Sequence, residues 1–260
     1  MPTVLAYHLI ERRPDAGIAW TTPARFEKQM AWLAEAGYRA LSLSEYLQFA
    51  PAPKEKRVVI TFDDGYRALR QYALPILARY HFRATVFAIA GYVGRANAWD
   101  VKFFLPRFPH LDWNELRELL AAGWEIGSHS LNHDYLPSLT DDELRNDLVD
   151  SKKILEDHLQ TPIRHLSLPF GRGSARVYQT AQDAGYASVS ILGGHGATSP
   201  LPLIPRRGVY LLDSMRSVRR RVEAPPDSAW QYWRQRAISS LALGTVMVKG
   251  AKKMLAGAVG

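Results

Sequence analysis

Two aspartates stand side by side where an apolar run ends. Asp63 and Asp64 follow "RVVITF" and precede Gly65. A carboxylate that is buried without a partner is costly, and a bound cation offsets this cost. One carboxylate can then bind a metal while the other takes a proton from a water molecule. Neighbouring residues of a strand point to opposite faces, so both side chains reach one site only if the chain bends, and Gly65 supplies freedom for a bend.

Two histidines have the spacing of a metal-binding pair. His129 and His133, in "HSLNH", are four residues apart, which would place both imidazoles on one face of a helical turn. With one carboxylate they form three ligands that leave positions open for water and substrate. Each pattern has a plain alternative, namely unrelated loop histidines and an Asp-Asp-Gly surface turn. The two patterns together predict a metal site.

Strand and helix patterns alternate along the first 200 residues. Apolar runs predict strands at 3–8, 39–43, 56–64, 84–90, 124–130, 165–170 and 187–192. Helices are predicted between them at 22–38, 44–50, 66–80, 112–123, 140–159 and 173–186, with a kink or break at Pro75. This alternation predicts an α/β fold, a closed or nearly closed (β/α) barrel of about seven parallel strands. His8, Asp63, Asp64 and His129 would then meet at the C-terminal ends of the strands.

The sequence resembles the polysaccharide deacetylase family, also called the NodB-homology or carbohydrate esterase family 4 domain. The resemblance rests on "TFDDG", "HSLNH" and "LSLPFG", and it spans roughly residues 3 to 210. It implies a distorted (β/α) barrel and a hydrolase that removes acetyl groups from glycans with one divalent metal. Zinc is the expected metal, and Fe, Co, Ni or Mn would suit the same ligands.

The resemblance implies roles for the residues of these motifs. Asp63 is the expected general base, and Asp64, His129 and His133 are the expected metal ligands. Phe170 stands where an aromatic residue of the family lends its backbone N–H to the oxyanion.

Four further residues are expected to bind substrate. Pro169 and Gly171 flank Phe170, and Trp99 resembles an aromatic residue at the edge of the cleft. Arg206, in the late strand "LPLIPRRGV", could hold a carboxylate near the site, but the choice between Arg206 and Arg207 stays open.

Two departures from the family pattern matter. Many members carry an arginine that orients the base where this chain has Ser167, so what orients Asp63 is open. The late Leu-x-His motif is also absent, because no histidine follows His195. However, "AYH" at residues 6–8 resembles a subgroup that acts on poly-N-acetylglucosamine, and in that subgroup an N-terminal Tyr-His supplies the acid. His8 is therefore the expected general acid.

The net charge of +8 lies wholly in the C-terminal segment. Residues 1–200 carry 22 basic and 22 acidic side chains, and residues 201–260 carry 11 and 3. We expect a barrel over residues 1–222 and a basic amphipathic helical segment over 223–260 that lies on an anionic membrane surface. The alternative is a helix packed on the barrel with a solvated basic face. Nucleic acid is not expected, since no recognition motif accompanies the charge.

Composition narrows the remaining choices. Cysteine is absent, which excludes thiol catalysis, and neither a membrane span nor a signal peptide is evident in the sequence. The expected location is the cytoplasm, with peripheral binding to the inner membrane face. The predicted reaction is de-N-acetylation of an N-acetylated glycan or lipid-linked sugar in exopolysaccharide or cell-envelope metabolism. A glycan-binding pseudoenzyme is the alternative, and a two-histidine, one-carboxylate iron oxygenase ranks last because its H-x-D pair is missing.

Overall fold

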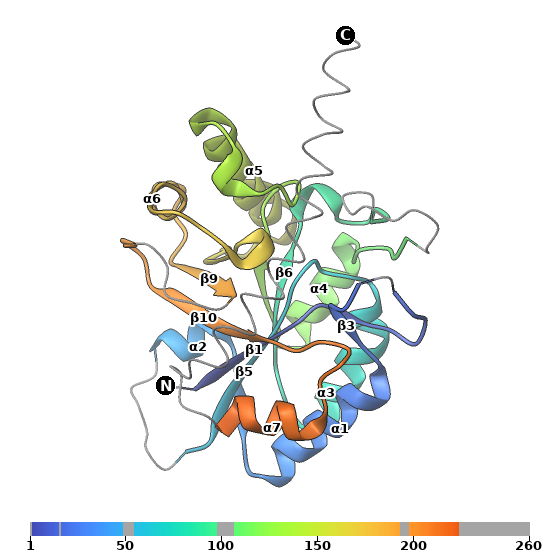
Figure 1. Ribbon diagram of the computed structural model, residues 1–260. Helices are drawn as coiled ribbons and strands as arrows, with labels where there is room; N and C mark the ends of the chain where they lie inside the picture. The colour runs from blue at the N-terminus through green and yellow to red at the C-terminus, as the bar shows by residue number, and fades with distance from the viewer. Residues whose placement is uncertain (1, 16, 49–54, 98–106, 193–197, 224–260) are drawn as a thin grey trace.

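Seven parallel strands close into a barrel in a computed structural model that describes residues 2–15, 17–48, 55–97, 107–192 and 198–223 (Figure 1). The strands follow the order β1-β10-β9-β8-β7-β6-β5, and β1 pairs back to β5. Their bounds are β1 Thr3–Tyr7, β5 Arg57–Phe62, β6 Thr85–Ala88, β7 Glu125–Ser128, β8 His165–Ser167, β9 Ser188–Leu192 and β10 Leu203–Gly208. The predicted (β/α) barrel is confirmed.

The barrel is distorted where β4 (Arg39–Leu41) meets it. This strand pairs with residues 57–59 at the start of β5, and β6 pairs with residues 61 and 62 at its end. The other edge of β5 pairs with β1. Strands β4 and β6 therefore pair with the same edge of β5, β4 along its first half and β6 along its second half. The closing strand of the ring is β10, whereas the sequence pattern counted the strand at 39–43 among the seven.

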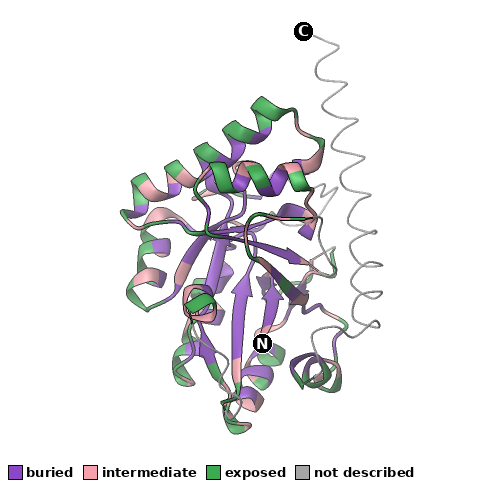
Figure 2. Cartoon of the chain, turned by 90° about the vertical axis from the view of Figure 1, so that its left-hand side faces the viewer, coloured by how far each residue is buried: buried purple, intermediate pink, exposed green. Residues whose placement is uncertain are grey.

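Helices cover the outside of the barrel, as Figure 2 shows by their exposed outer faces and the buried strands between them. They are α1 Pro23–Glu35, α2 Leu43–Gln48, α3 Leu74–Arg79, α4 Trp113–Ala121, α5 Asp141–Leu159, α6 Ala175–Asp183 and α7 Met215–Glu223. The helix predicted at 66–80 is irregular before Pro75 but not broken there, because a π-helix over Leu69–Ala73 passes directly into α3, which carries Pro75 in its first turn.

Several helix starts follow from capping residues. The side chain of Thr140 caps α5 and Glu143 completes a reciprocal capping box, and Asp112 and Glu115 do the same for α4. Such boxes satisfy backbone N–H groups that a helix leaves unpaired at its N-terminus. The start of α5 is thereby defined, which sets the position of its buried face against the barrel.

A small second sheet and three 3-10 turns connect the elements of the barrel. A two-stranded parallel sheet joins β2 (Leu9–Ile10) to β3 (Trp20–Thr21) directly after β1. The 3-10 turns are Ala90–Tyr92, Leu136–Ser138 and Pro169–Gly171.

The barrel interior changes from apolar to polar toward the C-terminal strand ends. Val4, Val59, Phe87 and Ile204, from four strands of the ring, belong to one buried cluster. Because side chains alternate along a strand, the residues two and four places after Val59 share its face, which brings Asp63 to the inside of the barrel. A buried carboxylate at that level needs partners from the neighbouring strands.

Some predictions concern parts of the chain outside the described residues. Trp99 and residues 224–260 lie there, so the substrate contact of Trp99, the helical tail and the domain boundary after residue 222 stay predictions. The last described helix, α7, buries Val218 and Val222 and therefore packs on the barrel. Within the described ranges, none of the helices combines the length and the apolar character that crossing a bilayer requires.

Candidate active site

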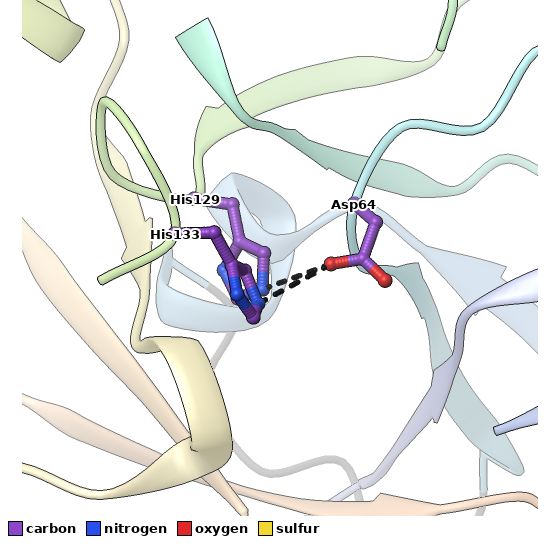
Figure 3. A group of neighbouring side chains, drawn as sticks. All are labelled: Asp64, His129 and His133. Carbon is purple, nitrogen blue, oxygen red and sulfur yellow. Dashed lines mark ion pairs between the residues drawn. The ribbon is translucent and has the colours of Figure 1, made fainter. Parts of the chain in front are cut away.

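The residues expected to do chemistry come together at the C-terminal ends of the strands. Oδ1 of Asp64, just after β5, lies 3.4 Å from Nε2 of His129 and 3.5 Å from Nε2 of His133 (Figure 3). All three residues are buried. Among the described residues, this is the one group of three ligand-type side chains close enough together to hold a metal ion.

The spacing of these three atoms suits a cation. Oδ1 of Asp64 is buried and accepts no hydrogen bond from any described group. Tetrahedral coordination with bonds of about 2.0–2.1 Å places ligand atoms about 3.4 Å from one another. Burial alone would raise the pKa of Asp64, but the neighbouring imidazoles of His129 and His133 lower it well below its usual range. The cluster therefore presents an ionised carboxylate and two imidazole nitrogens to one point.

Left-handed backbone conformations bend the chain into the site. Asp64 has φ 68° and Gly65 has φ 67°. The sequence analysis expected Gly65 to supply the bend, but the bend already begins at Asp64. Of the six described non-glycine residues with positive φ, four belong to this region: Asp64, Ser130, His133 and Phe170. Such conformations persist only where surrounding contacts hold them.

His110 holds the bend at Asp64. Its Nδ1 lies 2.8 Å from the carbonyl oxygen of Asp64, and because a carbonyl only accepts, Nδ1 carries the proton. The ring is buried and stacks on Tyr66 with 5.0 Å between centroids. Sequence reasoning assigned His110 no role, and no local signal links it to a residue 46 positions away.

The two histidines lie in a loop and not on the helical turn expected from their spacing. Ser130 and His133 have φ 69° and 55°, which a right-handed helix does not allow. Nδ1 of His129 donates to the carbonyl of Ser167 over 2.8 Å, which turns its Nε2 toward Asp64. The N–H of His133 donates to Oγ of Ser130 over 2.9 Å. Loop hydrogen bonds thus produce the convergence that the helical spacing had suggested.

Arg206 orients Asp63. Its NH1 lies 2.7 Å from Oδ1 of Asp63 and its NH2 lies 2.8 Å from Oδ2. NH2 also donates to Oγ of Ser167 over 2.6 Å, and that hydroxyl donates to Oδ1 over 3.2 Å. Burial alone would raise the pKa of Asp63, but the charge of Arg206 outweighs it and holds the pKa below its usual value.

The choice between the two arginines is thereby made, and the expected role of Arg206 changes. Arg207 turns to Oγ1 of Thr3 and to the backbone carbonyl of Arg221, away from the aspartates. The Arg206 side chain is directed to Asp63, Thr61 and Ser167, and the residue is only 1% exposed. The carboxylate that it holds belongs to the protein, so the substrate contact expected of it is replaced by an orienting contact.

His8 lies beside Asp63 at the end of β1. Its Nε2 is 3.8 Å from Oδ2 of Asp63, and its side chain is 15% exposed. Nδ1 is buried and has no hydrogen-bond partner among the described residues. The side chain therefore lies next to the carboxylate of Asp63 and is partly reached by solvent.

The turn at Phe170 forms one edge of the site. Phe170 has φ 61°, and its ring lies 5.0 Å from that of His133 and 6.1 Å from that of Tyr135 between centroids. Pro169 and Gly171 are buried in the same turn, and a Cβ on Gly171 would come within 2.3 Å of the Leu192 side chain. These two residues shape the turn, and their contact with substrate stays a prediction.

Comparison with known proteins decides the family. The model of the family described as "Polysaccharide deacetylase" matches residues 50–189, more than half of the chain. The chain belongs to this family. The match contains both aspartates, both histidines and the turn at Phe170.

Curated relatives share the sequence over part of their length. YxkH of Bacillus subtilis, which is named for the same family, is 33% identical over 70% of this chain and 61% of its own length. The peptidoglycan-N-acetylglucosamine deacetylase of Bacillus cereus is 32% identical over 58% of this chain and 63% of its own. The poly-beta-1,6-N-acetyl-D-glucosamine N-deacetylase of Staphylococcus aureus is 29% identical, over 57% and 52%. The chain therefore spans between half and two thirds of the length of these relatives.

Solved structures share the fold of this polysaccharide deacetylase family member. The Streptococcus pyogenes deacetylase PplD superimposes with a TM-score of 0.73 at 24% identity, covering 86% of this chain and 100% of PplD. IcaB from Ammonifex degensii superimposes with a TM-score of 0.72 at 23% identity, covering 85% of this chain and 97% of IcaB. At these identities the likeness concerns the fold.

Two site features of the family member were beyond sequence reasoning. Tyr135 packs edge-on against Phe170 from a loop after the second histidine, and Asp147 bonds the loop between the histidines from helix α5. Tyr135 follows "HSLNH" by two residues, so proximity to the motif was a usable signal. Asp147 carried only the signal of an acidic residue on the apolar face of a helix.

Proposed function

We propose that this chain is a metal-dependent N-deacetylase that hydrolyses the acetamide group of an N-acetylated glycan. The observation that carries the proposal is the three-ligand cluster of Asp64, His129 and His133, with the ion-paired carboxylate of Asp63 beside it. The names of two relatives support the substrate class, because both contain N-acetylglucosamine and deacetylation. They also favour an N-acetyl over an O-acetyl substrate.

Asp64, His129 and His133 would hold one divalent cation. Zinc is the metal that we propose, and Fe, Co, Ni or Mn suit the same ligands. When bound, such a cation supplies Lewis acidity toward the amide carbonyl and toward the attacking water.

Asp63 takes the proton of the attacking water in this proposal. The lowered pKa keeps its carboxylate ionised at neutral pH, so it is ready to accept a proton. Arg206 binds both of its oxygens and thereby limits the directions in which the carboxylate can turn. The reaction consumes one water and releases acetate and a free amine.

His8 and Phe170 serve the second half of the reaction. His8, 3.8 Å from Asp63, protonates the departing amine nitrogen. The backbone N–H of Phe170 donates to the oxyanion of the tetrahedral intermediate, where one such donor is typically worth about 3–4 kcal/mol.

The C-terminal charge supports a site of action at a membrane. Residues 201–260 carry 11 basic and 3 acidic side chains. Arg206 and Arg221 are buried in ion pairs, and each of the other basic residues adds about 1 kcal/mol of attraction where it lies near an anionic surface. We propose that the chain binds the inner membrane face and acts on a lipid-linked sugar or a growing exopolysaccharide there. Flotation with anionic and with neutral vesicles tests this, since recovery in the soluble fraction with both vesicle types contradicts it.

Isosteric substitutions at two neighbouring positions test the reaction. Asp64→Asn should lose both the metal and acetate release. Asp63→Asn should keep the metal and lose about 10²–10⁴-fold in kcat, the usual contribution of a general base. Metal content is measured by mass spectrometry, and acetate release is measured with an N-acetylglucosamine oligomer.

The outcomes distinguish the candidate functions. A wild-type protein that takes up no divalent metal, or an Asp63→Asn variant with wild-type kcat, contradicts the proposal. A wild-type protein that binds metal and the oligomer without releasing acetate is the glycan-binding pseudoenzyme.

A further inference from the structure

A carboxylate from helix α5 reaches the loop between the two histidine ligands. Oδ1 of Asp147 accepts a hydrogen bond from the N–H of Leu131 over 3.0 Å. Leu131 and Asn132 stand between His129 and His133 in the chain. Asp147 therefore bonds the segment that sets how the two imidazoles lie relative to each other.

The opposite side of this loop is held by the turn after β6. The carbonyl of Leu131 accepts from the N–H of Gly91 over 2.9 Å, and that of Ser130 accepts from the N–H of Ala90 over 3.1 Å. A Cβ on Gly91 would lie 2.7 Å from the Leu131 carbonyl oxygen, so only glycine allows this approach. The peptide at Leu131 is thus bonded from both sides, by backbone on one and by the carboxylate on the other.

The loop needs such support because its backbone is strained. Ser130 and His133 both adopt left-handed conformations, which cost about 1–3 kcal/mol each for non-glycine residues and persist only when surrounding contacts impose them. Without the Asp147 carboxylate the N–H of Leu131 would lose its acceptor, and the loop could then relax toward ordinary backbone angles.

The position of Asp147 is costly for the helix itself. Asp147 is 6% exposed and shares the buried face of α5 with Leu144, Leu148 and Leu155. Burial raises the pKa of Asp147 to about 7, so its ionised form is disfavoured there. An apolar side chain would pack on this face without that cost. The carboxylate therefore serves the loop, whose backbone it bonds, and not the packing of the helix.

We propose that Asp147 is a positioning residue for the metal centre, which holds the 130–132 backbone so that both imidazoles face Asp64. This inference rests on the proposed function, because it assigns the three-residue cluster to a metal. His129 is held independently through Ser167, so the position of His133 depends more on Asp147. The expected consequence of losing Asp147 is a weaker and less regular metal site in a protein that still folds.

The test measures metal affinity with Co²⁺ or Zn²⁺ alone as the probe, in the full-length chain. Asp147→Ala removes both acceptor oxygens and should weaken the metal Kd by about 10–100-fold, the usual effect of losing an outer-sphere partner. Asp147→Asn keeps one acceptor oxygen and should weaken it less. Asp150→Asn makes the corresponding change on the exposed face of the same helix and should leave Kd unchanged. The visible spectrum of bound Co²⁺ should change in Asp147→Ala, change less in Asp147→Asn and stay as in the wild type in Asp150→Asn.

Each outcome decides. A wild-type protein that binds no metal refutes the proposed function itself, and this inference falls with it. Wild-type binding together with an Asp147→Ala variant of equal Kd and equal Co²⁺ spectrum refutes the inference alone, as does an equal loss in Asp150→Asn. Should Asp147→Ala not fold by circular dichroism, Asp147→Asn decides instead, because an unchanged Kd and spectrum there also overturn the proposal.

Discussion

Arg206 and Asp63 form a buried two-point ion pair across the barrel. The guanidinium comes from β10 and reaches the carboxylate at the end of β5 with contacts of 2.7 and 2.8 Å. The two residues are 143 positions apart in the chain. Ser167, which stands where many family members carry an arginine, joins the same network through its hydroxyl. The orienting charge is therefore present, but a different strand supplies it.

Replacement of Arg206 by lysine should slow catalysis while preserving a positive charge. Lysine lacks the planar fork that binds two oxygens, so Asp63 would lose its fixed direction. We expect kcat for acetate release to fall by about 10²-fold, the effect of a small misplacement of a catalytic group. Arg207→Lys is the matched control, because Arg207 faces away from the aspartates, and it should keep wild-type kcat. Equal kcat in Arg206→Lys and Arg207→Lys would show that the ion pair does not orient the base.

Replacement of His8 by glutamine should separate proton donation from metal binding. His8 lies beside Asp63 and outside the three-ligand cluster, so metal content should stay at the wild-type level. Loss of a general acid should lower kcat by about 10²–10⁴-fold. The fall in rate at high pH, where the general acid loses its proton, should disappear from the pH–rate profile. An unchanged pH profile would exclude His8 as the proton donor.

Replacement of His110 by phenylalanine should weaken metal binding, although His110 is not one of the three candidate ligands. Phenylalanine can still stack on Tyr66 but donates no hydrogen bond to the carbonyl of Asp64. A buried carbonyl without its partner costs about 1–3 kcal/mol, so the left-handed conformation of Asp64 should loosen. Metal titration should show a Kd about 10-fold weaker. His158→Phe, on the exposed side of α5, should change nothing, and a wild-type Kd for both variants would refute the role of His110.

Asp147 should raise the unfolding free energy of the protein in weak acid relative to its value above pH 7. Its folded pKa is about 7 and its ordinary value is 3.8, so between these values the folded state holds a proton that the unfolded chain releases. The unfolding free energy therefore falls as pH rises through this window, by at most about 4 kcal/mol from this group.

Urea unfolding at pH 5 and pH 8, in the presence of a chelator, measures this effect. The difference in unfolding free energy between the two pH values should shift in Asp147→Asn, since that variant lacks the titrating group. Other carboxyls titrate alike in both proteins and cancel from the comparison. Identical pH dependence in wild type and variant would mean that Asp147 titrates near its ordinary value.

Local patterns predicted the elements better than they predicted the ring. Apolar runs located the strands, and the helices predicted at 22–38, 112–123 and 140–159 are present as α1, α4 and α5. The strand at 39–41 was nevertheless counted in the barrel, which β10 closes instead. Hydrophobicity reports that a strand is buried, but strand order depends on pairing with distant strands.

The motif residues show the same division. The "HSLNH" spacing predicted that two imidazoles share a site, and they do, although in a loop with left-handed residues and not on a helical turn. Spacing constrains which side chains can meet, but backbone angles depend on outside contacts such as those from Asp147 and Gly91. The role of His110 could not be predicted from the sequence, since its contact with Asp64 arises only when the loops pack.

The sequence by itself determined the fold class and the three candidate ligands, because strand periodicity, strand-end placement and the spacing within short motifs are local properties of the chain. The same motifs carried the resemblance to the family. Only the tertiary structure decided that Arg206 and not Arg207 faces Asp63, and that Asp64 itself bends the chain. It also decided that His110 bonds the backbone of Asp64 and that Asp147 bonds the loop between the two histidines. These are relationships between residues far apart in the chain. Their distances follow from strand order, register and loop packing, which no single stretch of the sequence specifies.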